Sequence, residues 1–417
     1  MKTKIAIIGG GASGLFSAIT ALTFGKNVEI TIFEQLNRVG KKLLATGNGR
    51  CNITNEFANA TSLVDHQEIP RFYHGNNKEF ALFALKKFSQ NDLIRFFEEN
   101  GLILKKEEDK YYPFSEQAGT IVDFLRFKCE MLGVNFVTEC KITEIVKNGN
   151  SFLINGQLFD KVIVACGGKS SPHLGSDGSG YDLLKKFGHK TTELSPAITQ
   201  IKTETEFVKQ LKGIKIDALC SIFVNDKLIR SEYGQVLFAD YGLSGPPIFQ
   251  LSRIASKNYN KNCYITLDFL NEFSENQVYD LIIKTLNQPF TYPLKAENLL
   301  SLILNKRLGQ IIVKSCGYKL DKDAYELSDK EIIIISKKIK NFKLNVKGVN
   351  GFQNAQVTAG GLDTCDFDDK TMHSKLIKNL YAIGEILDID GDCGGFNLQW
   401  AFSSGYIAAM NAIGEKI

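Results

Sequence analysis

The sequence lacks the features by which several classes of protein are recognised. It has no C-x-x-C pair, and its nine cysteines are an odd number scattered along 417 residues. This pattern argues against a disulfide scaffold and against a cysteine zinc site, and it is typical of a reducing cytosol. The five histidines, at positions 66, 74, 173, 189 and 373, show no ligand spacing. We therefore expect no metal site.

Long hydrophobic runs and a strong charge of one sign are also missing. No run of about 18 apolar residues occurs, so a membrane-spanning helix is not expected. Residues 1–4, of which Lys2 and Lys4 are basic, resemble the start of a signal peptide, but glycines at 9–11 interrupt the apolar run that follows, which favours a buried strand. The net charge of +4 permits contact with phosphates without indicating a dedicated nucleic-acid binder. These observations predict a cytoplasmic protein that does not associate with membranes.

The length and the change of pattern along the chain predict several domains. A chain of 417 residues is too long for one compact core, and its 44% hydrophobic and 23% charged residues are ordinary for a globular protein. Strands and helices alternate at both ends, whereas the middle has short alternating strands and then a block rich in Lys, Leu and Asn. We predict one discontinuous α/β domain (1–194 and 356–417), a β-rich insertion (195–273 and 341–355) and a helical subdomain (274–340).

Short apolar runs rich in β-branched residues indicate strands buried on both faces of a parallel sheet. In the terminal regions we expect strands at 4–8, 28–33, 161–165 and 380–383, with further strands over 135–147. The helices expected there are 15–24, 78–100, 120–132 and 398–413. In the insertion we expect strands at 214–224 and 263–269.

The most informative motif is Gly9-x-Gly11-x-x-Gly14, which follows a strand and opens a helix. The first glycine permits a tight turn, the second lets a pyrophosphate approach the backbone, and the third allows close packing of helix on strand. Glu34 ends the next strand, about 20 residues further on, where a carboxylate accepts hydrogen bonds from an adenosine ribose. Its charge would repel a ribose 2′-phosphate. The motif in this context predicts a dinucleotide site.

Two distal segments favour FAD over NAD as the bound dinucleotide. Residues 161–171 run from a strand into Gly167-Gly168, as in the second strand and turn of two-part FAD domains. Residues 379–390 resemble the strand whose Gly-Asp pair positions the ribityl chain, with Glu385 in place of the aspartate. A second GxGxxG after a strand is absent from the sequence. We predict a non-covalent FAD, with NAD(P)H as a transient electron donor.

The glycine-rich residues 391–396 precede the last helix, whose N-terminus would stabilise the negative charge of reduced flavin. The aspartates at 388, 390 and 392 fit such a flavin loop better than a calcium loop. Cys51 has no cysteine near it in the sequence, which argues against dithiol exchange. We interpret Cys51 as a packed thiol rather than a reactive thiolate beside Arg50.

Nearly the whole chain resembles the YhiN-like family of bacterial FAD-dependent oxidoreductases. The motifs that carry the resemblance are GGGASGL (9–15), GKKLLATGNGRCNITN (40–55), ACGGKSSPHLGSDGSGYDLLKKFGH (165–189), GLSGPPI (242–248), VTAGGL (357–362) and GEILDIDGDCGGFNLQWAFSSG (384–405). The resemblance implies a discontinuous Rossmann-like, glutathione-reductase-like FAD-binding domain with an inserted β-barrel-like domain and a small helical part. It also implies that segment 40–55 lies along the cofactor.

Fingerprint and resemblance together predict a set of cofactor-binding residues. These are Gly9, Gly11, Ala12, Ser13, Gly14, Glu34, Lys41, Lys42, Thr46, Gly47, Asn48, Arg50, Cys51, Asn52, Ile142, Ala165, Cys166, Gly167, Gly384, Glu385, Asp390, Gly395, Phe396, Asn397 and Leu398. The catalytic residues are not determined, and the candidates are Arg50, Asn52, Asp240 and Tyr241. The sequence does not identify the catalytic acid. The family usually has Thr-His before the aromatic residue of the GLSGP string, where this chain has Ala239-Asp240.

The resemblance implies an enzyme that reduces an activated C=C bond, because members are linked to steroid-like enones and to a uracil of ribosomal RNA. A flavin amine oxidase that produces hydrogen peroxide is one alternative. An RNA- or ribosome-binding flavoprotein is another, with some support from the lysines at 337, 338, 340, 343 and 347. The substrate is therefore a small molecule or an RNA, and the oligomeric state stays open.

Overall fold

The structure is a computed structural model that describes residues 2–58, 69–291 and 293–415. His66, one of the histidines considered for metal binding, lies outside the described residues. The chain forms two compact units with separate hydrophobic cores. The division of the insertion into a β-rich and a helical part stays a prediction.

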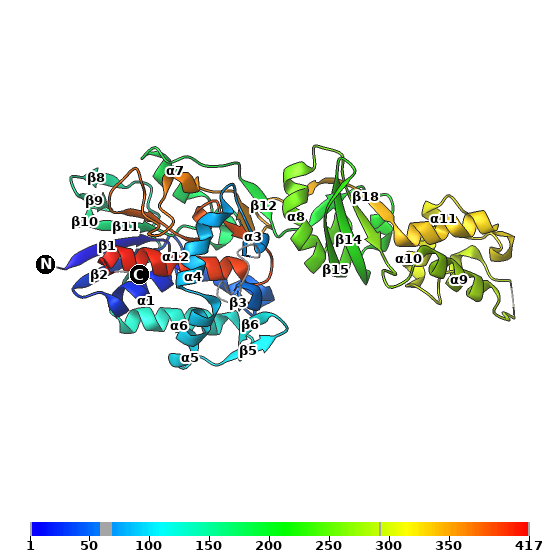
Figure 1. Cartoon of the computed structure of the whole chain (residues 1–417), viewed down its shortest axis with the longest axis horizontal. Helices are drawn as coiled ribbons and strands as arrows, with labels where there is room; N and C mark the ends of the chain where they lie inside the picture. Colours follow the sequence, from blue (N-terminus) through cyan, green and yellow to red (C-terminus); the bar gives the residue numbers. More distant parts are fainter. Residues whose placement is uncertain (1, 59–68, 292, 416–417) are drawn as a thin grey trace. The chain divides into compact units, whose positions relative to one another are not determined.

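The first unit, residues 1–196 and 352–417, is built on a parallel five-stranded sheet in the order β20-β11-β1-β2-β7 (Figure 1). Its strands are β1 (Thr3–Ile8), β2 (Val28–Phe33), β7 (Asn135–Val137), β11 (Lys161–Val164) and β20 (Leu380–Ala382). The last four residues of β1 and of β2 are buried, as expected for strands covered on both faces. The prediction of a Rossmann-like α/β domain is confirmed.

Three long helices accompany this sheet: α1 (Ala12–Phe24), α6 (Ala118–Met131) and α12 (Phe396–Ile413). Helix α12 packs along α1, and the two ends of the chain are thereby joined in one unit (Figure 1). The crossing is close, since a Cβ on Gly405 would lie 2.8 Å from the Ser13 carbonyl oxygen. Most of α12 is buried, which fits its apolar and small residues.

Two expected elements of this unit differ from the structure. The helical stretch 78–100 is broken into α4 (Ala81–Lys87) and α5 (Gln90–Glu99), because Ser89 caps α5 in a capping box with Asp92. Only the two ends of 135–147 are strands, namely β7 and β8 (Val146–Asn148). The remaining elements of this unit that bear on the site are α2 (Lys41–Leu44), β3 (Thr54–Asn55), α3 (Ile69–Phe72), β4 (Tyr73–His74), β5 (Leu104–Glu107), β6 (Lys110–Pro113), β9 (Ser151–Ile154), β10 (Gln157–Phe159), α7 (Ser179–Lys185), β19 (Val357–Ala359) and β21 (Asp390–Gly391).

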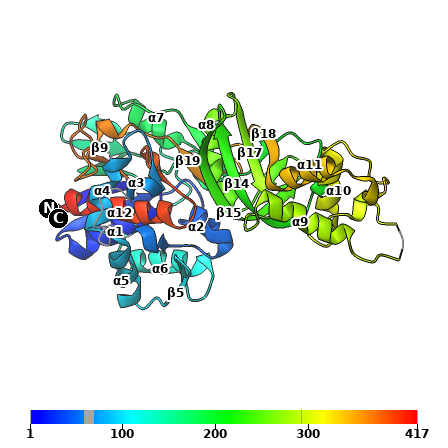
Figure 2. The same ribbon diagram turned by 45° about the vertical axis from the view of Figure 1, so that its right-hand side comes forward.

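The second unit, residues 197–351, contains a closed antiparallel barrel in the strand order β13-β16-β15-β14-β17-β18 (Figure 2). The strands are β13 (Ile201–Thr203), β14 (Lys215–Val224), β15 (Lys227–Ala239), β16 (Gly242–Ser244), β17 (Cys263–Asp268) and β18 (Phe342–Val349). Its helices are α8 (Pro246–Asn258), α9 (Glu275–Leu286), α10 (Lys306–Ser315) and α11 (Asp329–Lys340). The predicted barrel-like insertion is confirmed, and these helices contribute to the same hydrophobic core as the barrel.

Candidate cofactor site

The glycine turn between β1 and α1 has the packing that the fingerprint predicts. Gly9 has a φ of +110°, and a Cβ there would lie 2.3 Å from the Ala165 carbonyl oxygen. A Cβ on Gly14 would lie 2.1 Å from the Gly9 carbonyl oxygen, whereas a Cβ on Gly11 would meet nothing within 4 Å. Gly11 is the N-cap of α1 and has no side chain to bond the first N–H groups of the helix. The turn therefore leaves open space and free donors for a pyrophosphate.

Glu34 is held beside this turn. Its Oε2 accepts a hydrogen bond from the Gly10 N–H at 2.9 Å, and its Oε1 accepts one from the Leu36 N–H at 2.9 Å. Burial raises the pKa of the Glu34 carboxyl, while these backbone donors oppose the rise. Each carboxylate oxygen keeps a further lone pair. Its contact with a ribose stays a prediction.

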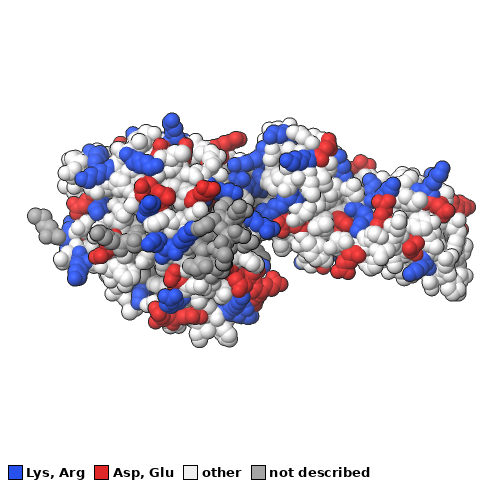
Figure 3. All heavy atoms as spheres, viewed as in Figure 1, with Lys and Arg blue, Asp and Glu red and all other residues white. Residues whose placement is uncertain are grey.

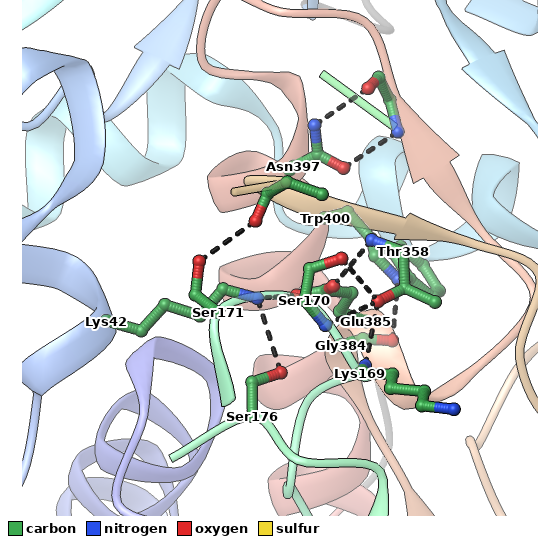
Figure 4. Close-up of polar contacts among 12 residues, drawn as sticks. Lys42, Lys169, Ser170, Ser171, Ser176, Thr358, Gly384, Glu385, Asn397 and Trp400 are labelled. Carbon is green, nitrogen blue, oxygen red and sulfur yellow. Dashed lines mark hydrogen bonds and ion pairs between the residues drawn. The ribbon is translucent and has the colours of Figure 1, made fainter. Parts of the chain in front are cut away.

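Four segments meet over the turn that follows β11, as Figure 4 shows. Lys42 Nζ lies 2.5 Å from Glu385 Oε2 and 3.3 Å from Ser176 Oγ. Glu385 Oε1 accepts the Thr358 N–H at 2.8 Å. A Cβ on Gly168 would lie 2.8 Å from Glu385 Oε1, so only glycine lets the carboxylate lie this close to the turn.

Thr358 is the centre of the polar network and was not among the predicted site residues. Its Oγ1 accepts hydrogen bonds from the N–H groups of Lys169, at 2.8 Å, and Ser170, at 3.0 Å. The hydroxyl of Ser170 lies 3.0 Å from the same oxygen. Nearby, Trp400 Nε1 donates to the Gly384 carbonyl oxygen at 3.0 Å (Figure 4). The only sequence signals for Thr358 and Ser170 were the family motifs that contain them.

Segment 46–52 has an unusual backbone, with positive φ at Gly47, Asn48, Gly49 and Cys51. Cys51 is fully buried, and burial raises the pKa of its thiol to about 11. A thiol with this pKa is protonated at neutral pH, which supports the packed-thiol interpretation. Asn48 is exposed at the tip of the segment.

Asn52 and Arg50 have polar atoms that are buried without a hydrogen-bond partner among the described residues: Asn52 Oδ1 and Arg50 Nε. Asn52 is 8% exposed. The Arg50 guanidinium stacks over the Tyr112 ring at 4.2 Å and forms an ion pair with Glu107 at 2.8 Å. A buried acceptor without a donor is costly in an apo protein and is explained by a ligand that supplies the donor.

The loop before α12 is held by Asn397. Its Oδ1 accepts the Gly391 N–H at 2.8 Å, and its Nδ2 donates to the Gly391 carbonyl oxygen at 2.8 Å. Gly395 caps α12 with a φ of +100°, and a Cβ there would lie 2.6 Å from the Thr54 backbone. Phe396 stacks on Phe72 with ring centroids 4.8 Å apart. The N-terminus of α12 is thus held by the hydrogen bonds of Asn397 and by packing against Thr54 and Phe72.

All the predicted cofactor-binding residues lie in the first unit, and several have a structural role there. Ile142 and Ala165 belong to its core, and burial raises the pKa of the Cys166 thiol to about 12. Asp390 is buried in β21. The other predicted members occupy the ends of the elements just described: Ala12 and Ser13 in α1, Lys41 in α2, Thr46 after α2, Gly167 after β11, and Leu398 in α12.

Two catalytic candidates lie in the second unit instead. Asp240 follows β15 and forms an exposed ion pair with Lys212 at 2.7 Å. That pair lowers the pKa of the Asp240 carboxyl. Burial raises the pKa of the Tyr241 hydroxyl, and the Asp240 charge adds to the rise. Their participation in catalysis stays a prediction.

The first unit fits FAD. It has an open glycine turn at a helix N-terminus, a carboxylate at the end of β2, and an acceptor on Asn52 that is buried without a partner in the part of the chain that the structure describes. It also has a second helix N-terminus at α12, reached through the Gly384–Glu385 segment. No group of three His, Cys, Asp or Glu that could hold a metal ion occurs among the described residues. Fold and site define a flavoprotein that binds FAD.

Comparison with known proteins assigns the family. Residues 3–411 match the model of the HI0933-like protein Rossmann domain. The chain belongs to this family and is a FAD-dependent oxidoreductase, which confirms the resemblance derived from the motifs.

Two relatives match over nearly the full length. The chain is 35% identical over 416 residues to a 3-dehydro-bile acid delta(4,6)-reductase from Clostridium scindens, covering 98% of each protein. It is 28% identical over 420 residues to a ribosomal RNA dihydrouridine synthase from Haemophilus influenzae, covering 97% of each. Among solved structures, 3-ketosteroid delta1-dehydrogenase from Sterolibacterium denitrificans, in complex with 1,4-androstadiene-3,17-dione, aligns over 100% of both chains. Its TM-score is 0.50 at 11% identity, which shows a similar fold alone.

Within the described residues, no helix has both the length and the apolar character needed to cross a bilayer.

Proposed function

We propose that this oxidoreductase reduces a C=C bond conjugated with a carbonyl group, with NAD(P)H as its electron donor. The observation that carries the proposal is the full-length identity of 35% to a protein named a bile acid delta(4,6)-reductase. Bound FAD supplies the hydride for such a reduction. The protein's own residues then have to hold the cofactor, exclude water and deliver a proton.

The first unit provides the groups that hold the cofactor. Gly11 and the N-terminus of α1 receive the pyrophosphate, and Glu34 receives the adenosine ribose. The backbone donors at the N-terminus of α12 would stabilise negative charge on a reduced flavin held beside them. Asn397 keeps the preceding loop in one conformation, so these donors need no rearrangement during the reaction.

The described fold is consistent with NAD(P)H as an electron donor that binds only transiently. The glycine-rich residues 175–180 precede α7, but they follow the short helix at Pro172–Leu174 rather than a strand. They therefore do not form a second strand–turn–helix site for a dinucleotide. The donor has to reach the flavin from outside and then leave, and substrate takes its place.

The charges of the second unit favour a small enone over RNA. Three of the five lysines proposed for RNA binding have partners within the chain. Lys337 lies 3.7 Å from Glu275 Oε1, Lys340 lies 2.8 Å from Asp268 Oδ2, and Lys343 lies 3.6 Å from the centroid of the Tyr264 ring. On the face drawn in Figure 3, basic and acidic side chains are mixed over the helical end of this unit. These contacts support the interpretation of a solvated surface.

Uridine in RNA is the second candidate, because a relative with 28% identity is named a ribosomal RNA dihydrouridine synthase. Uracil also contains a C=C bond conjugated with a carbonyl, so the same chemistry would serve both substrates. An RNA substrate requires phosphate contacts, and binding should then weaken steeply with salt. A small enone should show little dependence on salt.

The test is an anaerobic absorbance titration of the purified holoprotein with NADH and NADPH. We expect bleaching of the flavin band by one nucleotide and its recovery on addition of a steroid-like dienone or enone. Recovery only with uridine-containing ribosomal RNA would select the second candidate. Bleaching by amines but by neither nucleotide, with peroxide formed on exposure to air, would contradict both and indicate an amine oxidase.

A further inference from the structure

A histidine–aspartate pair lies outside the predicted cofactor-binding and catalytic residues. His74 Nε2 is 2.7 Å from Asp392 Oδ1. The Asp392 side chain is 5% exposed and that of His74 is 23% exposed. The aspartate is therefore buried, while part of the imidazole is exposed to solvent.

The pair adjoins the loop that leads into α12. Strand β4 pairs antiparallel with β21, which places His74 opposite Asp390. The Asp392 N–H donates to the Phe72 carbonyl oxygen at 2.9 Å. On the other side of the loop, Tyr73 Oη donates to the Phe396 carbonyl oxygen at 3.0 Å. These bonds fix β4 against the start of α12, whose N-terminus is proposed to face the flavin.

This arrangement suits proton transfer. A buried carboxylate that accepts a hydrogen bond from one imidazole nitrogen orients the ring and stabilises its protonated form. The second nitrogen is then the one that exchanges a proton with another molecule. Histidine is the side chain that most often serves as a general acid near neutral pH.

Other charged groups along β4 contribute to the surroundings of His74. Asp388 Oδ2 accepts the Asn76 N–H at 3.1 Å, and Asp390 is the register partner of His74. From α3, the Arg71 guanidinium lies 5.7 Å from the Phe72 ring centroid. Among these described neighbours, carboxylates are more numerous than cations, and any pH dependence of the pair includes their influence.

We propose that His74 donates the proton taken up by the reduced C=C bond and that Asp392 is its positioning residue. This inference rests on the proposed function. The electron-poor carbon of the substrate gains a hydride from reduced FAD, which is thereby oxidised. The neighbouring carbon gains a proton from the imidazolium of His74, and solvent then returns a proton to the neutral imidazole.

The experiment separates the two half-reactions of the holoprotein. Wild type, His74→Gln, Asp392→Asn and the double variant are reduced anaerobically with NAD(P)H or dithionite, then mixed with the enone that reoxidises the wild type. His173→Gln is the control, because His173 is an exposed histidine of the same unit. Flavin content and reduction by NAD(P)H should stay within about threefold of wild type in all variants. Reoxidation by the enone should slow by about 100-fold or more in His74→Gln, the range expected for loss of a general acid.

Three further readouts separate proton donation from a structural role. The pH profile of the reoxidation rate should differ between the wild type and His74→Gln, because the variant lacks the group that exchanges a proton with the substrate. Added imidazole should restore part of the rate in His74→Gln only. The double variant should be no more than about threefold slower than His74→Gln, since residues that act as a unit are not additive.

The outcomes distinguish this proposal from the proposed function. If His74→Gln is reoxidised at the wild-type rate per bound flavin, or loses FAD while its pH profile is unchanged, His74 is not the donor. If reduced wild-type protein is reoxidised by neither an enone nor uridine-containing RNA, the proposed C=C reduction is itself wrong, and the role of His74 is overturned with it.

Discussion

Lys42 and Glu385 are 343 positions apart in the sequence, yet Lys42 Nζ lies 2.5 Å from Glu385 Oε2. Their side chains are 25% and 17% exposed, so water screens the pair only partly. The second carboxylate oxygen accepts the Thr358 N–H. One carboxylate thus joins the start of α2, the strand β19 and the segment after β20 around the proposed cofactor.

Replacing Lys42 should therefore weaken FAD binding. Lys42→Met removes the cation that holds the Glu385 segment against the turn after β11, and it removes positive charge from a site expected to hold a diphosphate. We expect the dissociation constant of FAD to rise about tenfold, equivalent to about 1.4 kcal/mol. Quenching of FAD fluorescence on titration into apoprotein measures this. Lys26→Met, at an exposed lysine, is the control for loss of charge. An unchanged constant in Lys42→Met would show that the pair has no role in binding.

Two of the fingerprint glycines, Gly11 and Gly14, should respond differently to replacement by alanine. Gly14→Ala places a Cβ 2.1 Å from the Gly9 carbonyl oxygen, and we expect a loss of about 3 kcal/mol in the unfolding free energy. Gly11→Ala meets no atom within 4 Å, so its stability should change by less than about 1 kcal/mol. Gly11→Ala should nevertheless bind FAD more weakly, because its methyl group occupies the space for the pyrophosphate. Urea unfolding of the apoprotein and FAD titration separate the two effects. Normal FAD affinity in Gly11→Ala would argue against a pyrophosphate site at the glycine turn.

Replacing Asn52 should change the binding of the cofactor but should not lower the stability of the apoprotein. Its Oδ1 is buried without a partner among the described residues, so Asn52→Leu leaves no protein donor unpaired at that atom. We expect the unfolding free energy of the apoprotein to be unchanged or higher by up to about 1 kcal/mol. Either the affinity for FAD or the reduction potential of the bound flavin should fall, because the group of FAD that donates to Asn52 Oδ1 loses its acceptor. Asn52→Asp is the comparison: it keeps an acceptor but buries a charge, and it should lower stability. Full FAD affinity and an unchanged potential in Asn52→Leu would contradict this role.

The stability of the protein should decrease in mild acid because of His189. Its Nδ1 lies 3.0 Å from the Leu184 carbonyl oxygen and its Nε2 lies 2.8 Å from Ser374 Oγ. Burial lowers the pKa of His189 below its value in the unfolded chain, so the unfolded state binds the proton more readily. The stability contribution is present above about pH 6.5 and is lost as pH falls through the lower folded-state pKa.

Urea unfolding between pH 7.5 and pH 5 measures this loss. His189→Gln should be less stable than wild type at neutral pH and should show a smaller decline on acidification. The half-buried His373, whose pKa burial also lowers, contributes to the residual decline. An equal decline in wild type and in His189→Gln would rule out His189 as a source of the acid sensitivity.

The fingerprint region could be predicted from sequence because its determinants are local. The spacing of Gly9, Gly11 and Gly14 follows from the geometry of one turn and one helix. The position of Glu34 follows from the length of one βαβ unit. The break at Ser89 was missed because the apolar period continues across it, while a capping box starts a new helix there. The capping side chains are visible in the sequence, but they do not show that a helix ends just before them.

The polar network of the site could not be predicted residue by residue. Thr358 lies in the short strand β19 and Ser170 in a loop, and neither residue type indicates a site by itself. The role of Thr358 comes from two backbone donors that belong to another part of the chain. His74 gave no signal, because its partner Asp392 is 318 positions away. Arg50 was expected along the cofactor, and its stacking on Tyr112 in β6 depends on the pairing of β6 with β3.

The dinucleotide turn, the buried parallel strands and the family could be read from the sequence, since they depend on local spacing, on apolar runs and on motifs. Which charged and polar groups meet became visible only in the folded chain: Lys42 with Glu385, Thr358 with Ser170, and His74 with Asp392. Hydrogen bonds and ion pairs act over a few ångströms. Distances that short between residues remote in the sequence are set by the pairing of the strands and by the packing of α12 on α1.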